Sequence, residues 1–256
     1  MSARDFLVCG LLAGLIAGLA AFGVAFVAGE PTLDAAIAIE HSTSQDHETQ
    51  TNAEASAETV VPRWLQASAG LLTGTILAGV TLGGLFGVLT GLAAGRLGEL
   101  GVRGTALAVT AIGFVAIGVV PFVAYPPNPP SVGRPETIGQ RTSLYFVLMA
   151  ISVIAATAAV LLGRRAANRW GSWYGLLAAI AGYLVAMTVV IALMPSYDEV
   201  PAGFPASLLY QFRLASFGTG LVLWAVLGVG LAELTSWLLR RRRPAVKPLA
   251  GKAADR

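Results

Sequence analysis

Charged side chains are scarce in this sequence: Asp, Glu, Lys and Arg make up only 12% of its 256 residues. A soluble domain of this length needs far more polar surface to cover itself. Cys9 is the single cysteine, so no internal disulfide can form. The chain has no nucleotide-binding G-x-x-x-x-G-K-[ST] loop and no serine–histidine, cysteine–histidine or H-E-x-x-H arrangement. These absences argue against an ATPase and against an enzyme.

Long apolar runs make up most of the sequence. Runs of about 18 or more apolar residues are typical of membrane spans. They lack the alternation of barrel strands, and backbone groups in lipid must be paired, so we expect helices. The runs cover residues 6–28, 67–94, 105–124, 143–163, 174–194 and 214–239. The sequence therefore predicts an all-α, polytopic membrane protein with a transmembrane domain of six helices over residues 1–239.

The distribution of basic residues predicts the orientation of the spans. With both termini in the cytoplasm, 13 of the 17 Lys and Arg lie on the cytoplasmic side, in agreement with the positive-inside rule. Residues 240–256 then form a basic cytoplasmic tail. We interpret this tail as an orientation anchor that contacts anionic membrane lipid, and we do not expect it to bind nucleic acid.

Glycine recurs every four residues on one face of each of the first two spans. This small-xxx-small spacing lets another helix approach closely, and close helix packing is our main interpretation. It favours retention of the first span over its removal as a signal peptide. For the second span, lining of a pathway is the alternative. The glycines are Gly10, Gly14 and Gly18 in the first span and Gly79, Gly83, Gly87 and Gly91 in the second.

Proline is concentrated on the predicted outer side, which holds eleven of the thirteen prolines. The segment "AYPPNPP" is expected to be a stiff, polyproline-like strut. Each outer loop re-enters the membrane near an arginine: Arg63, Arg141 or Arg213. We expect three two-helix hairpins, formed by spans 1–2, 3–4 and 5–6, which would place these arginines on one face.

Carboxylates of the same loops are the expected partners of these arginines, because arginine near a helix N-terminus opposes the macrodipole. Rigid loops can hold polar groups over a pore mouth. One hypothesis is that acids held by arginine form the floor of a vestibule, to which neutral oxygens contribute. The alternative is that the charges only lock the loops together. The residues concerned are Tyr125, Asn128, Glu136, Arg141, Asp198, Glu199 and Arg213.

The first outer loop differs from the others, because a short helical extension is followed by a polar segment, residues 41–60, that we expect to be flexible. His41 and His47 lie there beside Asp46 and Glu48. Imidazole and carboxylate together suit divalent ions such as Co²⁺, Ni²⁺ and Zn²⁺. The segment is therefore either a dynamic metal-gathering site or an ordinary solvated linker.

Three long stretches carry a resemblance to a known family: "GLLAGLIAGLAAFGVAFVAGEPTLDAAIAIE", "PFVAYPPNPPSVGRPETIGQRTSLY" and "MPSYDEVPAGFPASLLYQFRLASFG". The chain resembles the CbtA family of cobalt transporter subunits over nearly all its length except the basic tail. The resemblance implies import of Co²⁺ across the cell (cytoplasmic) membrane in connection with cobalamin synthesis. It also implies a small membrane partner of the CbtB type. Similar proteins often have a denser histidine cluster after the first span, which only His41 and His47 match here.

The sequence thus favours a non-enzymatic cobalt importer subunit with no permanently bound cofactor, whose outer loops gather and guide the ion. The alternative is an assembly or regulatory subunit that transports nothing and docks a partner through its rigid outer face. Glu233 is the one carboxylate within a span. An intramembrane acid is a functional candidate, but the position of Glu233 near the cytoplasmic end favours snorkelling to the interface or local pairing.

Overall fold

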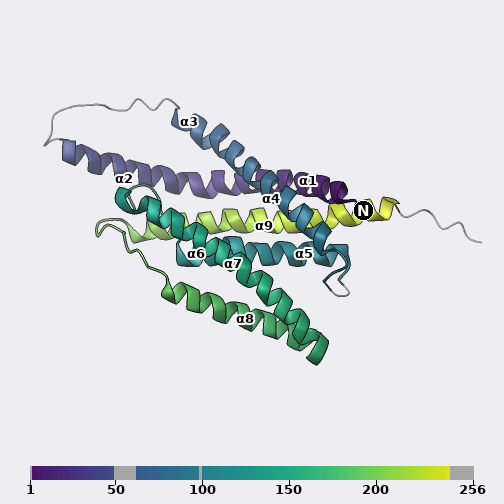
Figure 1. Cartoon of the computed structure of the whole chain (residues 1–256). Coiled ribbons are helices and arrows are strands. Elements are labelled where there is room, and N and C mark those ends of the chain that lie inside the picture. Colours follow the sequence, from purple (N-terminus) through teal and green to yellow (C-terminus); the bar gives the residue numbers. More distant parts are fainter. Residues whose placement is uncertain (1, 49–61, 98–99, 243–256) are drawn as a thin grey trace, which may run out of the picture.

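The computed structural model describes residues 2–48, 62–97 and 100–242, and within them all regular secondary structure is helical. Six helical segments are long and apolar enough to cross a membrane, as Figure 1 shows. This confirms the expected all-α class and the six spans. The segments are Ala3–Ser42, Arg63–Ala93, Val102–Ala124, Ile138–Trp170, Ser172–Leu193 and Ala206–Arg241.

The first span continues well beyond the predicted end of its apolar run. Helix α1 (Ala3–Val24) passes through a π-helical turn, η1 (Ala25–Gly29), into α2 (Glu30–Glu48). The segment that we expected to be flexible from residue 41 is therefore still helical as far as Glu48. The rest of that segment, residues 49–60, lies outside the described residues.

Wide π-helical turns also occur in the next two spans, whereas the last three spans are regular α-helices. Such turns let a helix change direction without losing its backbone hydrogen bonds. The second span consists of α3 (Arg63–Leu65), η2 (Gln66–Gly70) and α4 (Leu71–Ala93). The third consists of α5 (Val102–Gly113), η3 (Phe114–Val119) and α6 (Val120–Ala124). The others are α7 (Pro135–Trp170), α8 (Ser172–Leu193) and α9 (Ala206–Arg242).

Helices α1 and α4 pack with their backbones in contact along the two glycine faces. A Cβ atom added to Gly14 would lie 3.0 Å from Gly83 Cα, and one added to Gly87 would lie 3.0 Å from Gly10 Cα. Any side chain at these positions would separate the helices. The absence of a Cβ thus creates the interface, as small-xxx-small packing requires.

Helix α9 lies beside both α1 and α5 (Figure 1). Its side chains Trp224, Leu227 and Leu231 belong to the same buried cluster as Ala13 and Ala17 of α1. The last span therefore packs between the first and the third. The pairing of spans 3–4 and 5–6 expected from loop connectivity is wrong: span 3 packs mainly against span 6, and span 4 against span 5.

The α7–α8 hairpin forms a separate, peripheral layer. Gly163 and Gly175 allow its two helices to approach closely near the turn, and a buried hydrogen bond of 2.7 Å joins the hydroxyls of Ser152 and Tyr183. The hairpin touches the rest of the bundle chiefly through η3 and α6. Figure 1 accordingly shows α8 at the edge of the bundle.

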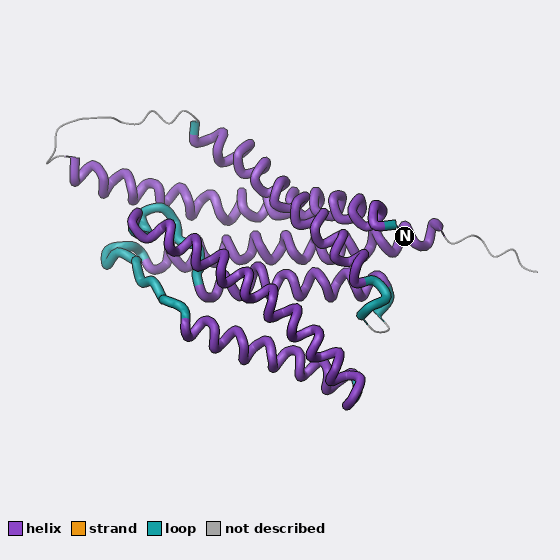
Figure 2. The backbone as a smooth tube through the Cα atoms, in the orientation of Figure 1, coloured by secondary structure: helices purple, strands orange, loops and turns teal. Residues whose placement is uncertain are grey.

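The two ends of the bundle differ in their connections. One end, here called the loop end, carries residues 125–134 and 194–205 and the α2 extension, as Figure 2 shows. The opposite end carries the N-terminal residues, the α4–α5 connection and the tight α7–α8 turn at Gly171. Polar groups held in a fixed geometry by connections are therefore to be sought at the loop end.

Candidate functional site: a cavity framed by ion-paired loops

A small apolar cluster ties α2 to both connections at the loop end. Ala36 of α2, Val132 of the first connection and Phe204 of the second are each less than 10% exposed and are packed in one cluster. Three segments that are distant in sequence thus bury apolar surface together, which fixes their relative positions. This cluster consequently fixes the positions of the polar groups that the two connections carry.

An ion pair between α7 and the second connection is the central polar contact of this end. Arg141 Nη1 lies 3.0 Å from Glu199 Oε2, and the Glu199 side chain is only 6% exposed. Glu199 also accepts the backbone N–H of Arg134 at 3.1 Å. Gly133, with φ of 123°, brings its backbone so close that a Cβ would lie 3.1 Å from Arg141 Nη1. Because glycine adopts this left-handed conformation without strain, the backbone of the first connection can lie directly against the ion pair.

The surroundings of Glu199 favour its ionised form. The pKa of the carboxyl lies below its usual range, because the Thr137 hydroxyl, the Arg134 N–H and the Arg141 guanidinium together outweigh the opposing effect of burial. A carboxylate that already accepts several hydrogen bonds offers few remaining lone pairs. Glu199 therefore has a structural role at the loop end: it joins the second connection to Arg134 and Arg141.

Two further hydrogen bonds hold the strut between the helices. Arg213 Nη2 of α9 donates to Asn128 Oδ1 at 2.9 Å, and the Tyr125 hydroxyl donates to the carbonyl oxygen of Pro195 at 2.8 Å. Nε of Arg213 is buried and has no hydrogen-bond partner among the described residues. Asn128 and Tyr125, expected to supply neutral oxygens, thus use them to join the loops. Burial raises the pKa of the Tyr125 hydroxyl, with a smaller effect from Tyr197.

The remaining candidate acids of these loops stand apart. Asp198 and Glu136 are exposed, and within the described part of the chain neither side chain makes an ion pair or hydrogen bond. Of the arginines that we expected on one face, Arg63 also lies at the loop end and pairs with Glu30 and with Asp34, the latter at 2.8 Å.

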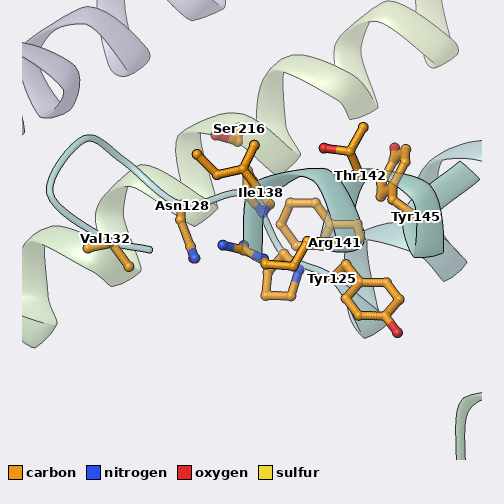
Figure 3. Close-up of a pocket in the computed structure, with 11 residues that line it drawn as sticks. Tyr125, Asn128, Val132, Ile138, Arg141, Thr142, Tyr145 and Ser216 are labelled. Atoms are coloured by element: carbon orange, nitrogen blue, oxygen red, sulfur yellow. The ribbon is translucent and has the colours of Figure 1, made fainter. Parts of the chain in front are cut away.

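Between the strut, α7 and α9 lies a cavity of about 530 Å³ (Figure 3). Its polar lining contains a guanidinium, hydroxyls and an amide, and none of the described residues that line it is acidic. The hydroxyls of Thr142 and Tyr145 make no hydrogen bond within the described residues. The polar lining residues are Tyr125, Asn128, Arg141, Thr142, Tyr145 and Ser216.

Sequence reasoning missed three of these lining residues: Thr142, Tyr145 and Ser216. The signal for Tyr145 was available, since the residue four positions after Arg141 lies beside it on the same helix face. The polar side chains of Thr142 and Tyr145 looked like the ordinary start of a span. Ser216 of α9 gave no comparable signal, because its place beside the strut depends on packing of the last span against the third.

The structure brings together no metal cluster within its described part: no group of three or more His, Cys, Asp or Glu side chains there is arranged to hold an ion. His41 is exposed on α2. The side chains of Asp46, His47 and Glu48 lie outside the described residues. Glu233, expected to pair locally near the opposite end, forms an ion pair with Arg103 of α5.

The comparisons with known proteins give one match. A family model described as "Probable cobalt transporter subunit (CbtA)" matches residues 3–236, which include the first five spans, most of the sixth and every residue that lines the cavity. No curated protein and no solved structure matches the chain.

Proposed function

Since this chain belongs to the CbtA family of probable cobalt transporter subunits, we propose that it imports cobalt through the cavity at its loop end. The main support for the proposal is the fixed arrangement of the ion-paired and hydrogen-bonded residues around that cavity. The Arg141–Glu199 ion pair and the hydrogen bonds of Glu199 and Arg213 hold two connections in one geometry against α7 and α9. A linker between spans needs no such rigidity, whereas a site that must present polar groups to a solute does.

The loop end is the extracytoplasmic end in this proposal. The basic residues support it, because most Lys and Arg belong to the opposite end of the bundle and to the tail after α9. Reporter fusions after Arg103, Arg169 and Arg243 should report a cytoplasmic location. Fusions within residues 126–134 and 198–204 should report an extracytoplasmic one. A cytoplasmic signal from either loop fusion would reverse the direction of the proposed entry.

The segment that begins at α2 acts as the gathering element. His41 and His47 raise the local concentration of cobalt near the entrance, because imidazole nitrogen is a suitable ligand for divalent cobalt. The cargo then supplies cobalamin synthesis in the cytoplasm. The family name describes a subunit, and we propose a small membrane protein of the CbtB type as the partner in the cytoplasmic membrane.

Reconstitution tests the proposed transport directly. The purified full chain is placed in proteoliposomes with and without the small partner, and entry of radioactive cobalt is measured against protein-free liposomes. We expect entry above the background of protein-free liposomes, at least with the partner present. If cobalt accumulates in neither preparation, whether supplied as the chloride or as a chelate, the transport function is refuted.

A further inference from the structure

The cavity at the loop end offers hydrogen-bond donors to whatever enters it. Arg141 lines it with a guanidinium that has five N–H donors and no acceptor. The hydroxyls of Thr142 and Tyr145 line the same wall and have no partner among the described residues. All three residues lie in the first turns of α7, and Figure 3 shows them around the cavity that they line.

The amide and carboxylate acceptors near the cavity, by contrast, are already engaged. Asn128 Oδ1 accepts from Arg213, and Glu199 accepts from Arg141 and from the Arg134 N–H. A divalent ion such as Co²⁺ is held in proteins mainly by imidazole and carboxylate ligands. The described lining contains neither and offers only neutral oxygens.

The charge of the surroundings also disfavours a bare cation. Glu199 neutralises the charge of Arg141. Arg213, which donates a hydrogen bond to Asn128, has no carboxylate partner within the described residues. Its Nε atom is buried and has no hydrogen-bond partner among the described residues. The lining itself carries one guanidinium and, among the described residues, no acidic side chain, so it provides no negative charge to a bare cation.

We propose that this cavity binds cobalt as an anionic chelate, a Co²⁺ complex of a carboxylate-bearing organic ligand, and not as the bare ion. This inference rests on the proposed transport function and specifies the form of its cargo. The carboxylate oxygens of the chelator accept from Arg141, Thr142 and Tyr145, which is the charge-assisted pairing that guanidinium favours. A volume of about 530 Å³ suits a small organic complex.

Removal of single donors gives a clean test, because the Thr142 and Tyr145 hydroxyls hold nothing else in the described structure. Thr142→Val and Tyr145→Phe keep the shape of each side chain and remove only its hydroxyl group. Ser143→Ala is the matched control on the same helix, since that hydroxyl is exposed and bonds its own backbone at Gly139. Tyr210→Phe is the second control, at an exposed tyrosine of α9.

Equilibrium binding to the purified full chain in detergent uses four probes: cobalt–citrate, cobalt–nitrilotriacetate, cobalt chloride and metal-free citrate. We expect at least one chelate to bind more tightly than cobalt chloride and than metal-free citrate. Thr142→Val and Tyr145→Phe should each weaken chelate binding by about tenfold, as loss of a hydrogen bond to a charged group does. Ser143→Ala and Tyr210→Phe should bind as the unmodified chain does.

Several results would overturn the inference. Binding of neither chelate refutes it, as does equal binding of chelates by the two hydroxyl variants and the unmodified chain. Tighter binding of cobalt chloride, weakened by the same variants, would identify a bare-cation site instead. Equal binding of metal-free citrate would identify a site for the organic anion alone. Since binding in detergent requires no transport, these outcomes are independent of whether cobalt enters proteoliposomes.

Discussion

The close contact between α1 and α4 yields a quantitative prediction for Gly14→Ala. The added methyl group would lie 2.8 Å from the carbonyl carbon of Gly79 and 3.0 Å from Gly83 Cα, whereas ordinary van der Waals contact begins at 3.4 Å. The obstructing atoms are backbone atoms of another helix, so no side-chain rotation can relieve the overlap. The two helices must move apart by about half an ångström or more, which loosens the whole glycine face.

Overpacking of a well-packed interior typically costs about 1–3 kcal/mol. We expect the upper part of that range here, because a rigid helix has to shift. For a chain of this size each kcal/mol lowers the melting temperature by roughly 2–4 °C. Gly14→Ala should therefore melt roughly 4–12 °C below the unmodified chain.

Gly23→Ala on the same helix is the matched control, since a Cβ there has no atom within 4 Å. Alanine also has the higher helix propensity, so this variant should melt at or slightly above the temperature of the unmodified chain. Thermal unfolding in detergent, followed by the loss of the monodisperse peak in size-exclusion chromatography, measures both. Equal melting of Gly14→Ala and Gly23→Ala would show that the two glycine faces are not in contact.

Three further predictions concern the loop end. Glu199→Gln and Arg141→Ala should each lower the melting temperature, because each single change leaves the other residue buried without its partner. The double variant should lower it by less than the sum of the two single effects. Strictly additive losses would show that the two residues do not interact. Because the folded pKa of Glu199 is depressed, its stabilising effect is complete above the unfolded pKa of about 4.3 and is lost as pH falls through the folded value. Melting of the unmodified chain should thus decline in acid, and that of Glu199→Gln should decline less; parallel profiles would contradict this. His41→Ala combined with His47→Ala should reduce cobalt uptake mainly at low cobalt concentration, and loss at all concentrations would place these histidines in the translocation site instead.

The spans were predictable because the bilayer imposes one length and one composition on every segment that crosses it. The glycine faces were visible for a related reason: the absence of a side chain every fourth residue marks a face regardless of context. The pairing of the later spans was not predictable. Leu227 and Leu231 of α9 look like the lipid-facing leucines of any span, and only packing shows that they are buried against α1.

Prediction of the candidate site had a similar limit. Loop charges in a stiff, proline-rich setting indicated that Arg141 and Glu199 matter, and the structure brings these two together. The use of Asn128 by Arg213 depends on where α9 lies relative to the strut, which hydropathy and loop length do not specify. The unpaired hydroxyls of Thr142 and Tyr145 were overlooked because a sequence does not show which donors lack a partner.

The contact between the first and last spans has a consequence for biogenesis. Ala13 and Ala17 of α1 are fully buried partly because α9 covers them, and α9 is the last span to leave the ribosome. The glycine face of α1 can meet α4 as soon as the second span has been inserted. The face that carries Ala13 and Ala17 stays exposed to lipid until nearly the whole chain has been translated. A ribosome stalled before residue 206 would therefore leave a membrane intermediate whose first helix is packed against α4 on one face and exposed to lipid on the other.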